Sequence, residues 1–228
     1  QKVIDNALEA KVALEVADQT LANSLRGREG ELEEFFISRG ASVNHEISPL
    51  ADLSLLALLH ERGYRPVEVT AILARPSADL PPIALNPRIT VREVGKGEQD
   101  AYIRLAAEAW NLPPEFDSFF AELAQVNRFN PHVVHFFAEL DGQPVGCGGL
   151  CLSDGVALIA GDSTLPAARG HGAQQALIAA RIEYARRRGD DLVMMGALPG
   201  STSQKNGQRC GLQICYTRIK WEKSPSSS

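Results

Sequence analysis

The residues best suited to holding a charged ligand form the run Arg169-Gly170-His171-Gly172-Ala173-Gln174. The apolar run 156–160, which precedes it, is typical of a buried strand. A helix follows, indicated by apolar residues at helical spacing: Ala173, Ala176, Leu177, Ala180 and Tyr184. The first amides of a helix lack partners within it, and glycine lets an anion approach the backbone closely. The order of strand, glycine loop and helix start therefore predicts an anion-binding loop.

Three other loop types share part of this pattern. A Walker loop requires a lysine followed by Ser or Thr after its last glycine, and neither is present. A dinucleotide-binding loop requires a third glycine, where Gln175 stands, and an acidic residue that closes the next strand. Asp190 and Asp191 instead precede the next predicted strand. A plain tight turn without a ligand is the remaining alternative.

The pattern Gln/Arg-x-x-Gly-x-Gly/Ala fits the run, with Arg169 first and Gly172 fourth. It resembles the pyrophosphate loop of the GNAT superfamily of acyl-CoA N-acetyltransferases. Gln174 departs from this pattern, because it replaces the closing Gly or Ala. The elements expected over 88–228 also follow the order of a GNAT domain. The run 199–206 and the ending 215–218 resemble a bacterial branch that carries two GNAT units in one chain.

The resemblance implies a mixed α/β (α+β) fold, in which helices flank a central sheet and the parallel strands 156–164 and 192–197 splay apart. Acetyl-CoA is the implied cosubstrate, and a primary amine of a small molecule or peptide would receive the acetyl group by direct attack. The pantetheine arm would meet the main chain of Thr164 and Leu165. Arg169 would add charge to a pyrophosphate site, and the remaining binding residues would be Gly170, Gly172, Ala173, Gln174, Ser203 and Asn206.

The proton-transfer residues common in that family are missing from their usual positions. The tyrosine that often protonates the departing thiolate would stand at Gly207, and the run 156–160 holds no glutamate. Asp162, ahead of Glu139, is therefore the candidate that helps water remove the amine proton. Tyr216 or solvent would protonate the thiolate. These weakened positions keep a second function open, that of a CoA-binding regulatory or scaffold module without turnover.

The element pattern also suggests an internal duplication. Residues that begin or end the predicted elements recur at a spacing of 148 to 150 residues: Arg39-Gly40, Pro49 and Gly63 correspond to Arg188-Gly189, Pro199 and Gly211. We predict a partial, degenerate GNAT-like unit in 1–85 and a GNAT domain in 86–228, joined by a proline-rich linker at about 75–88. The first half would stand where a second subunit would, giving an intramolecular pseudo-dimer in a monomer.

Turn residues and hydrophobic periodicity place the remaining elements. The helix near 31–39 is expected to bury Phe35 and Phe36. Trp110 is either a core residue or part of an acceptor pocket, and His171 is expected to be exposed and inert. The other predictions are strands at 43–47, 67–73, 89–94, 133–140, 145–152, 192–197 and 212–221, helices at 3–25, 52–62, 99–110 and 115–127 and after 201 or 203, and a disordered tail at 224–228.

Bulk properties exclude several classes. The 228 residues carry a formal charge of −5, and no basic stripe indicates nucleic acid. No apolar stretch is long enough to span a membrane and no signal-peptide pattern is present, so a cytoplasmic protein is expected. The spacings of Cys147, Cys151, Cys210 and Cys215 match no zinc site, and buried free thiols without a metal are predicted.

Overall fold

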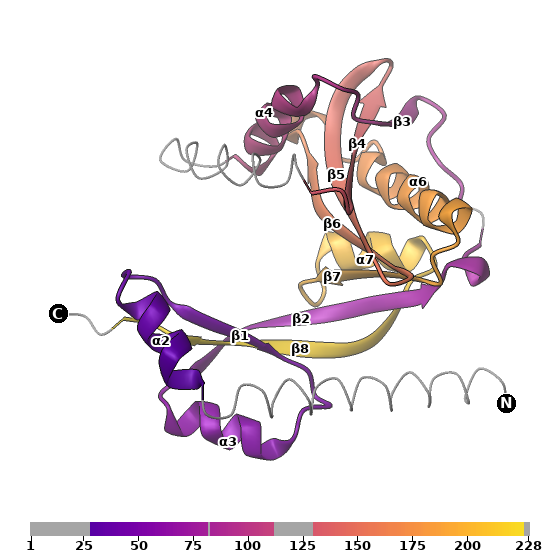
Figure 1. Cartoon of the computed structure of the whole chain (residues 1–228). Helices are drawn as coiled ribbons and strands as arrows, with labels where there is room; N and C mark the ends of the chain where they lie inside the picture. Colours follow the sequence, from indigo (N-terminus) through magenta and orange to yellow (C-terminus); the bar gives the residue numbers. More distant parts are fainter. Residues whose placement is uncertain (1–27, 82, 112–129, 226–228) are drawn as a thin grey trace, which may run out of the picture. The chain divides into compact units, whose positions relative to one another are not determined.

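The computed structural model describes residues 28–81, 83–111 and 130–225 (Figure 1). The helices predicted at 3–25 and 115–127 lie outside these residues. Contacts between residues divide the chain into two compact units. Among the described residues, the larger unit lies within Ile72–Cys215, and the smaller unit combines those up to Ala71 with those from Tyr216 on. Two strands, β2 (Arg65–Pro76) and β8 (Gln213–Lys223), contribute residues to both units.

The sheet of the larger unit begins with an antiparallel meander and ends in a parallel pair. Its strands are β3 (Ile89–Glu93), β4 (Val133–Leu140), β5 (Gln143–Ser153), β6 (Val156–Thr164) and β7 (Leu192–Ala197). Each of β3–β6 pairs antiparallel with the next, whereas β6 and β7 are parallel. Asp141 and Gly142, at φ 51° and 81°, make the predicted tight hairpin between β4 and β5.

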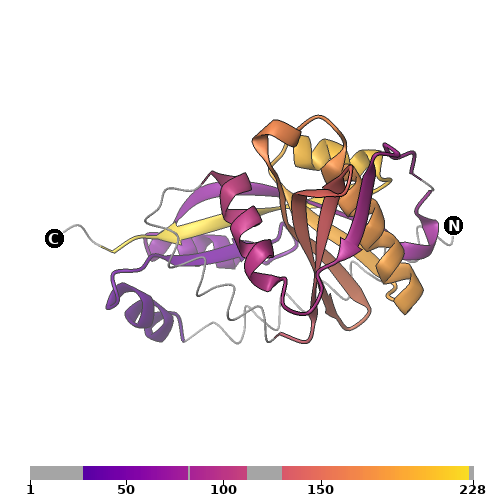
Figure 2. The same cartoon turned by 90° about the horizontal axis from the view of Figure 1, so that it is seen from above.

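Helices cover both faces of this sheet. Helices α4 (Gln99–Trp110) and α6 (Ala173–Arg188) lie on opposite faces of β4–β6 (Figures 1 and 2). Helix α6 ends at Gly189, whose φ of 83° gives the left-handed cap expected of a glycine stop. Helix α7 (Thr202–Arg209) contacts α6 and β7, and Ser201 caps its start. The predicted mixed α/β fold with helices flanking the sheet is confirmed.

The smaller unit has its own core. It contains α2 (Glu29–Ile37), β1 (Val43–Ile47) and α3 (Leu53–Glu61). The start of α3 is fixed by Asp52, whose Oδ1 accepts a hydrogen bond from the Ser54 amide at 2.7 Å. Strand β1 pairs antiparallel with the end of β8. Over the described chain the strands are hydrogen-bonded in the order β1-β8-β2-β7-β6-β5-β4-β3. The buried core of the unit is made of Val43, Leu55, Leu59 and Tyr64.

Three sequence predictions need correction. On α2, Phe35 and Phe36 are 52% and 38% exposed while Glu33 is buried, so the predicted apolar face is wrong. An ion-pair cluster around Glu33, rather than an apolar stripe, faces the interior. Cys215 is exposed and Cys151 only half-buried, so the expectation of four buried thiols fails, although all four cysteines are free. Strand β2 continues to Pro76, and η1 (Ser77–Asp79) follows, so the first residues of the proline-rich segment are regular structure.

The ion pairs around Glu33 predict how the stability of the folded chain depends on pH. Arg62 Nε and Nη2 donate to the Glu33 carboxylate at 2.8 and 3.0 Å, and Lys223 Nζ donates at 2.8 Å. Burial alone would raise the pKa of Glu33, but these two cations lower it from 4.5 to about 2. The interactions of Glu33 with these two cations therefore stabilise the folded chain above pH 4.5, and this stabilisation is lost as the pH falls toward 2.

We expect Glu33→Gln to lower the free energy of unfolding at pH 7 by about 3 kcal/mol, because two cations lose their partner. Denaturant unfolding at pH 7 and at pH 3 measures this. The difference between variant and wild type should shrink at pH 3. Glu34→Gln, at an exposed position on the same helix, is the matched control. Equal stability of Glu33→Gln and Glu34→Gln at pH 7 would contradict the prediction.

Candidate functional site

The parallel strands β6 and β7 separate part of the way along their length. Their pairing runs from Val156 opposite Leu192 to Ile159 opposite Met195. Strand β6 then continues to Thr164 and β7 to Ala197 without pairing to each other. This confirms the predicted splay and leaves one edge of β6 open beyond residue 159.

A β-bulge lies where the splay begins. On β5 and β6, Gly149 pairs with Ala160 and Cys147 pairs with Ser163, so Gly161 and Asp162 together face the single residue Gly148. Gly161 has a φ of 66°, which a glycine tolerates. A Cβ on Gly148 would stand 2.7 Å from Arg181 Nη1 and 2.8 Å from Asp162 Oδ1. No larger residue fits there without movement of these two side chains.

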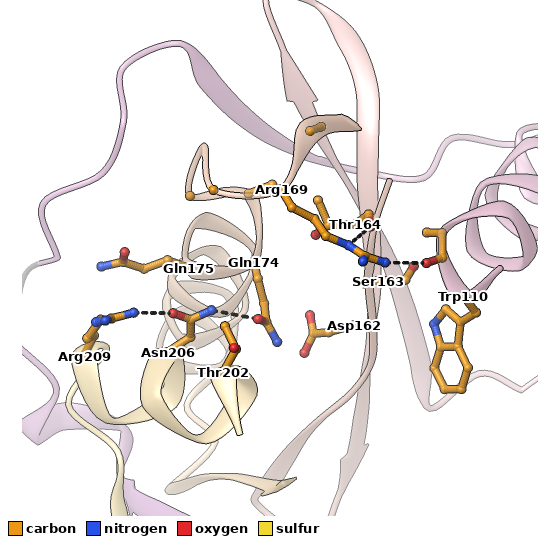
Figure 3. Close-up of a pocket in the computed structure, with 15 residues that line it drawn as sticks. Trp110, Asp162, Ser163, Thr164, Arg169, Gln174, Gln175, Thr202, Asn206 and Arg209 are labelled. Carbon is orange, nitrogen blue, oxygen red and sulfur yellow. Dashed lines mark hydrogen bonds between the residues drawn. The ribbon is translucent and has the colours of Figure 1, made fainter. Parts of the chain in front are cut away.

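A cavity of about 700 Å³ lies at the open end of the splay (Figure 3). Its walls come from the end of β6, the glycine loop, the first turn of α6, helix α7 and the last residues of α4. The lining residues are Ala109, Trp110, Asp162, Ser163, Thr164, Ala168, Arg169, Gly170, Gly172, Ala173, Gln174, Gln175, Thr202, Asn206 and Arg209. Most of the predicted binding residues are thus brought together in one place.

The glycine loop has the backbone of an anion site. Gly170 and Gly172 have φ values of 84° and 88°, and Gly172 is the N-cap of α6 without a capping side chain. A Cβ on Gly170 would meet no atom within 4 Å, and one on Gly172 would meet only Asn86, at 3.9 Å. The loop therefore leaves room for a ligand, the first residues of α6 line the cavity without a capping side chain, and the helix dipole favours a negative charge there. The residues fit a diphosphate.

Asn86 anchors this loop from outside the cavity. Its Nδ2 donates to the His171 carbonyl at 3.0 Å, and its Oδ1 accepts from the Arg88 amide at 3.0 Å. The His171 side chain is exposed, as predicted, and its Nδ1 contacts the Ala168 carbonyl. The sequence pattern does not reveal Asn86, because 85 residues separate it from its partner.

Arg169 turns toward α4 rather than over the loop amides. Its Nε donates to the Thr164 carbonyl at 3.3 Å and its Nη2 donates to the Ala109 carbonyl at 3.2 Å (Figure 3). Trp110 follows at the end of α4 and is 53% exposed, so it is not a core residue. It lines the cavity, which agrees with the alternative of an acceptor-pocket residue.

The unusual Gln174 links α6 to α7. Its Nε2 donates to Ser203 Oγ at 3.1 Å, and its Oε1 accepts from Asn206 Nδ2 at 2.7 Å. Arg209 extends the chain of bonds to Asn206 (Figure 3). Gln174 and Asn206 line the cavity, whereas Ser203 joins it only through Gln174. A glycine or alanine at position 174 would leave this link unmade.

Not every predicted residue reaches the cavity. The Leu165 amide donates to the Val145 carbonyl at 2.8 Å, and Leu165 is not part of the lining. Tyr216 is a half-buried residue of β8 in the smaller unit and is also absent from the lining. Glu139 accepts a hydrogen bond from Arg92 at 2.7 Å and lies outside the lining as well. Among the carboxylates considered in the sequence, Asp162 is the one at the cavity.

Asp162 is held by a fully buried arginine. Its Oδ1 pairs with Arg181 Nη2, and the Arg181 side chain has no exposed surface. Burial raises the pKa of the Asp162 carboxyl, and Arg181 opposes this rise. The sequence pattern missed Arg181, although a charge among the apolar residues Leu177, Ile178 and Ile182 is an available signal.

Close packing explains the glycine at position 207. A Cβ there would lie 2.6 Å from Met195 Sδ and 3.3 Å from Leu73 Cδ2. Helix α7 therefore lies so close to β7 that any side chain at position 207 would have to displace Met195 and Leu73. A tyrosine at this position is incompatible with the packing, so a proton donor, if the chain uses one, must come from elsewhere.

Residues 99–204 match the family model of the acetyltransferase (GNAT) family. Similar solved structures include a GCN5-related N-acetyltransferase from Sphaerobacter thermophilus, with 24% identity and a TM-score of 0.64, covering 81% of this chain and 60% of that one. One from Kribbella flavida has 22% identity, a TM-score of 0.63 and coverages of 86% and 73%. A tandem GNAT protein from the clavulanic acid biosynthesis pathway has 16% identity, a TM-score of 0.59 and coverages of 82% and 64%.

These likenesses show that the chain has the GNAT fold. The chain spans about 60% of the length of the Sphaerobacter protein. No curated protein matches it. Over the described residues, no helix is long and apolar enough to cross a membrane.

Proposed function

We propose that the chain is an N-acyltransferase that moves the acetyl group of acetyl-CoA to a primary amine of a small molecule or peptide. One observation carries the proposal: the splay between β6 and β7 opens onto a cavity whose floor is the uncapped start of α6. An extended arm with an amide can pair with an open strand edge, and a diphosphate fits at the helix start. The match of residues 99–204 to the family model includes both features.

In this proposal acetyl-CoA supplies an activated thioester, and the chain holds the thioester and the amine in position to react. The amides of Gly172, Ala173 and Gln174 would hold the diphosphate, and the edge of β6 at Thr164 would orient the pantetheine arm. Positioning two reactants can lower the activation barrier substantially, with effective molarities of about 10⁵–10⁸ M. Arg169 would reach the diphosphate only by leaving the carbonyls of Thr164 and Ala109.

The amine must be neutral to attack, and the leaving thiolate must gain a proton. Asp162 lines the cavity, and burial raises the pKa of its carboxyl above the usual value, which makes its carboxylate a stronger proton acceptor. We assign to Asp162 the removal of the amine proton through a water molecule. Protonation of the thiolate is assigned to solvent, because Tyr216 belongs to the smaller unit and does not line the cavity, and no metal takes part in the proposal.

A non-catalytic CoA-binding module is the second candidate function. The observation that favours it is the packing at Gly207, which excludes the tyrosine acid common in the family. The two functions share the CoA site and differ only in turnover. In either case the proposed location is the cytoplasm.

An acceptor screen separates the two functions. The purified chain is mixed with acetyl-CoA and a panel of primary amines, and the release of free thiol is followed. Calorimetry with CoA is run in parallel. We expect CoA binding together with amine-dependent thiol release for at least one amine. Binding without release for any amine would favour the module, and absence of CoA binding would contradict both functions.

We also propose that the chain contains two related units, the first of them degenerate. The succession β1–α3–β2 in the first half matches β7–α7–β8 in the second. Within the larger unit the end of β2 lies beside β7, where the Ser77 amide donates to the Asp191 carbonyl at 2.9 Å. Within the smaller unit the end of β8 lies beside β1, with Lys223 opposite Val43. Each copy thus contributes part of its last strand to the unit of the other copy.

This exchange supports an intramolecular pseudo-dimer and a monomeric chain, and similarity to a tandem GNAT protein agrees with it. We expect a fragment of residues 86–228 to be poorly soluble or unstable, because β7 would lose its neighbour β2 and expose a strand edge. Soluble expression and thermal melting of the fragment measure this. A fragment as stable as the full chain would contradict the proposal.

A further inference from the structure

We propose that Arg181 is a positioning residue that holds the β6 bulge and the Asp162 carboxylate in place, and so maintains the splay. This inference rests on the proposed function, because it concerns the same cavity. Arg181 lies on α6, outside the cavity lining, and reaches the site only through its partners.

The guanidinium of Arg181 is fully buried and donates four hydrogen bonds. Its Nε donates to the Leu177 carbonyl at 2.9 Å, within α6. Its Nη1 donates to the Gly149 carbonyl at 2.8 Å and to the Ala160 carbonyl at 3.3 Å, and its Nη2 donates to Asp162. Burying a charge is costly unless it is paired and hydrogen-bonded, and a planar fork of five donors is needed to satisfy four acceptors at once. These contacts indicate a built arrangement rather than a chance burial.

The acceptors of this arginine lie where the strand ladder is interrupted. Gly149 and Ala160 are the last pair before the bulge, on β5 and β6 respectively. Ala160 also follows Ile159, the last residue of β6 that pairs with β7. The guanidinium therefore donates to carbonyls at the point where β6 loses its regular pairing with both β5 and β7. Gly148 leaves the space that the guanidinium occupies.

Other titratable groups near Asp162 do not compete with Arg181. Tyr102 on α4, Cys147 on β5 and Cys210 beyond α7 all interact electrostatically with Asp162. Burial raises the pKa of Tyr102, that of Cys147 to about 11 and that of Cys210 to about 12. These three groups are uncharged at neutral pH, so over the described chain Arg181 is the charged partner shown for Asp162.

The test uses the full chain and the variant Arg181→Lys, which keeps the charge but loses the fork. We expect kcat/KM to fall about tenfold to a hundredfold, because small misplacements of reacting groups have effects of this size. Burial raises the pKa of Asp162, and a lysine at position 181 would counteract this rise less than Arg181 does. The acid limb of the kcat–pH profile should therefore move up by about one pH unit. CoA affinity, measured by calorimetry, should also weaken, because the splay is less well held.

Two further variants complete the design. Arg187→Lys, at an exposed position on the same helix, should match the wild type in every measurement. Gly148→Ala keeps both charges but crowds Arg181 and Asp162, and should shift the same acid limb. It remains informative if Arg181→Lys does not fold. A purely structural role would lower the melting temperature without moving the limb.

The outcomes distinguish this inference from the proposed function. If the wild type neither binds CoA nor turns over, the proposed function fails. If the wild type is active but Arg181→Lys and Gly148→Ala keep its CoA affinity and its pH profile, the inference about Arg181 is overturned and the proposed function stands.

Discussion

The variant Gly172→Asp should lose acetyl-CoA binding, with an affinity reduced more than about 100-fold. Gly172 is the N-cap of α6, and the amides beyond it face the cavity. An aspartate there would place a carboxylate where a diphosphate must approach, and juxtaposed like charges cost several kcal/mol. Aspartate at a φ of 88° is strained, at a cost of about 1–3 kcal/mol, but its charge suits the helix start, and we expect the fold to be retained. Calorimetry with acetyl-CoA measures the loss.

The control for this variant must reproduce its backbone strain. Gly189, which follows the last residue of α6, has a φ of 83°, close to the 88° of Gly172. Gly189→Asp therefore introduces the same residue in a similar conformation at the other end of the helix, and should bind acetyl-CoA like the wild type. A folded Gly172→Asp chain with wild-type affinity would show that the loop is not the diphosphate site.

Asp162→Asn is expected to reduce kcat by about 10²- to 10⁴-fold, the usual effect of losing a positioned acid or base. Its effect on the KM for acetyl-CoA should be small, since the loop amides carry most of that binding. Because burial raises the pKa of Asp162, the wild-type rate should fall as the pH drops through that pKa. The variant should lack this acid limb. Measurements of kcat from pH 4 to 10 with a confirmed acceptor test both statements.

Two further variants are measured beside Asp162→Asn as controls. Glu139→Gln removes a carboxylate that pairs with Arg92 outside the cavity lining, and should leave the rate unchanged. Tyr216→Phe changes the tyrosine that the sequence suggested as a donor, and it should also leave the rate unchanged because Tyr216 lies outside the cavity lining. Wild-type rates and pH profiles in both Asp162→Asn and Tyr216→Phe would show that neither residue carries a proton. Positioning of thioester and amine would then account for catalysis.

The elements that the sequence predicts best are those with local signals at both ends. Helix α6 begins directly after the glycine loop, as predicted, and Gly189 is its C-cap. Helix α4 and strand β7 also begin and end at the predicted residues. Turn chemistry at Asp141-Gly142 requires positive φ at both positions, which these residues accept. Local conformational preference is sufficient for such features.

Features that depend on distant partners were not predictable in this way. Phe35 and Phe36 have an apolar pattern, but Glu33 is the buried residue because Arg62 and Lys223 meet it from far along the chain. Trp110 is exposed at the end of α4 although its size favours burial. The splay was expected only from a family resemblance. A charge among apolar residues singles out Arg181 but does not reveal its partners, and nothing local marks Asn86 as the residue that holds the glycine loop. Hydrogen bonds to distant carbonyls leave no periodic pattern in a sequence.

Amide hydrogen exchange of the full chain, with and without acetyl-CoA, tests the central claim most directly. If the ligand occupies the cavity between β6 and β7, protection should increase in the glycine loop and first turn of α6, over 170–176, and along 160–165. Exchange in α3 of the smaller unit should stay the same. Saturable binding of acetyl-CoA without added protection in 170–176 would contradict the account, since the loop amides would then not be the ones that hold the ligand.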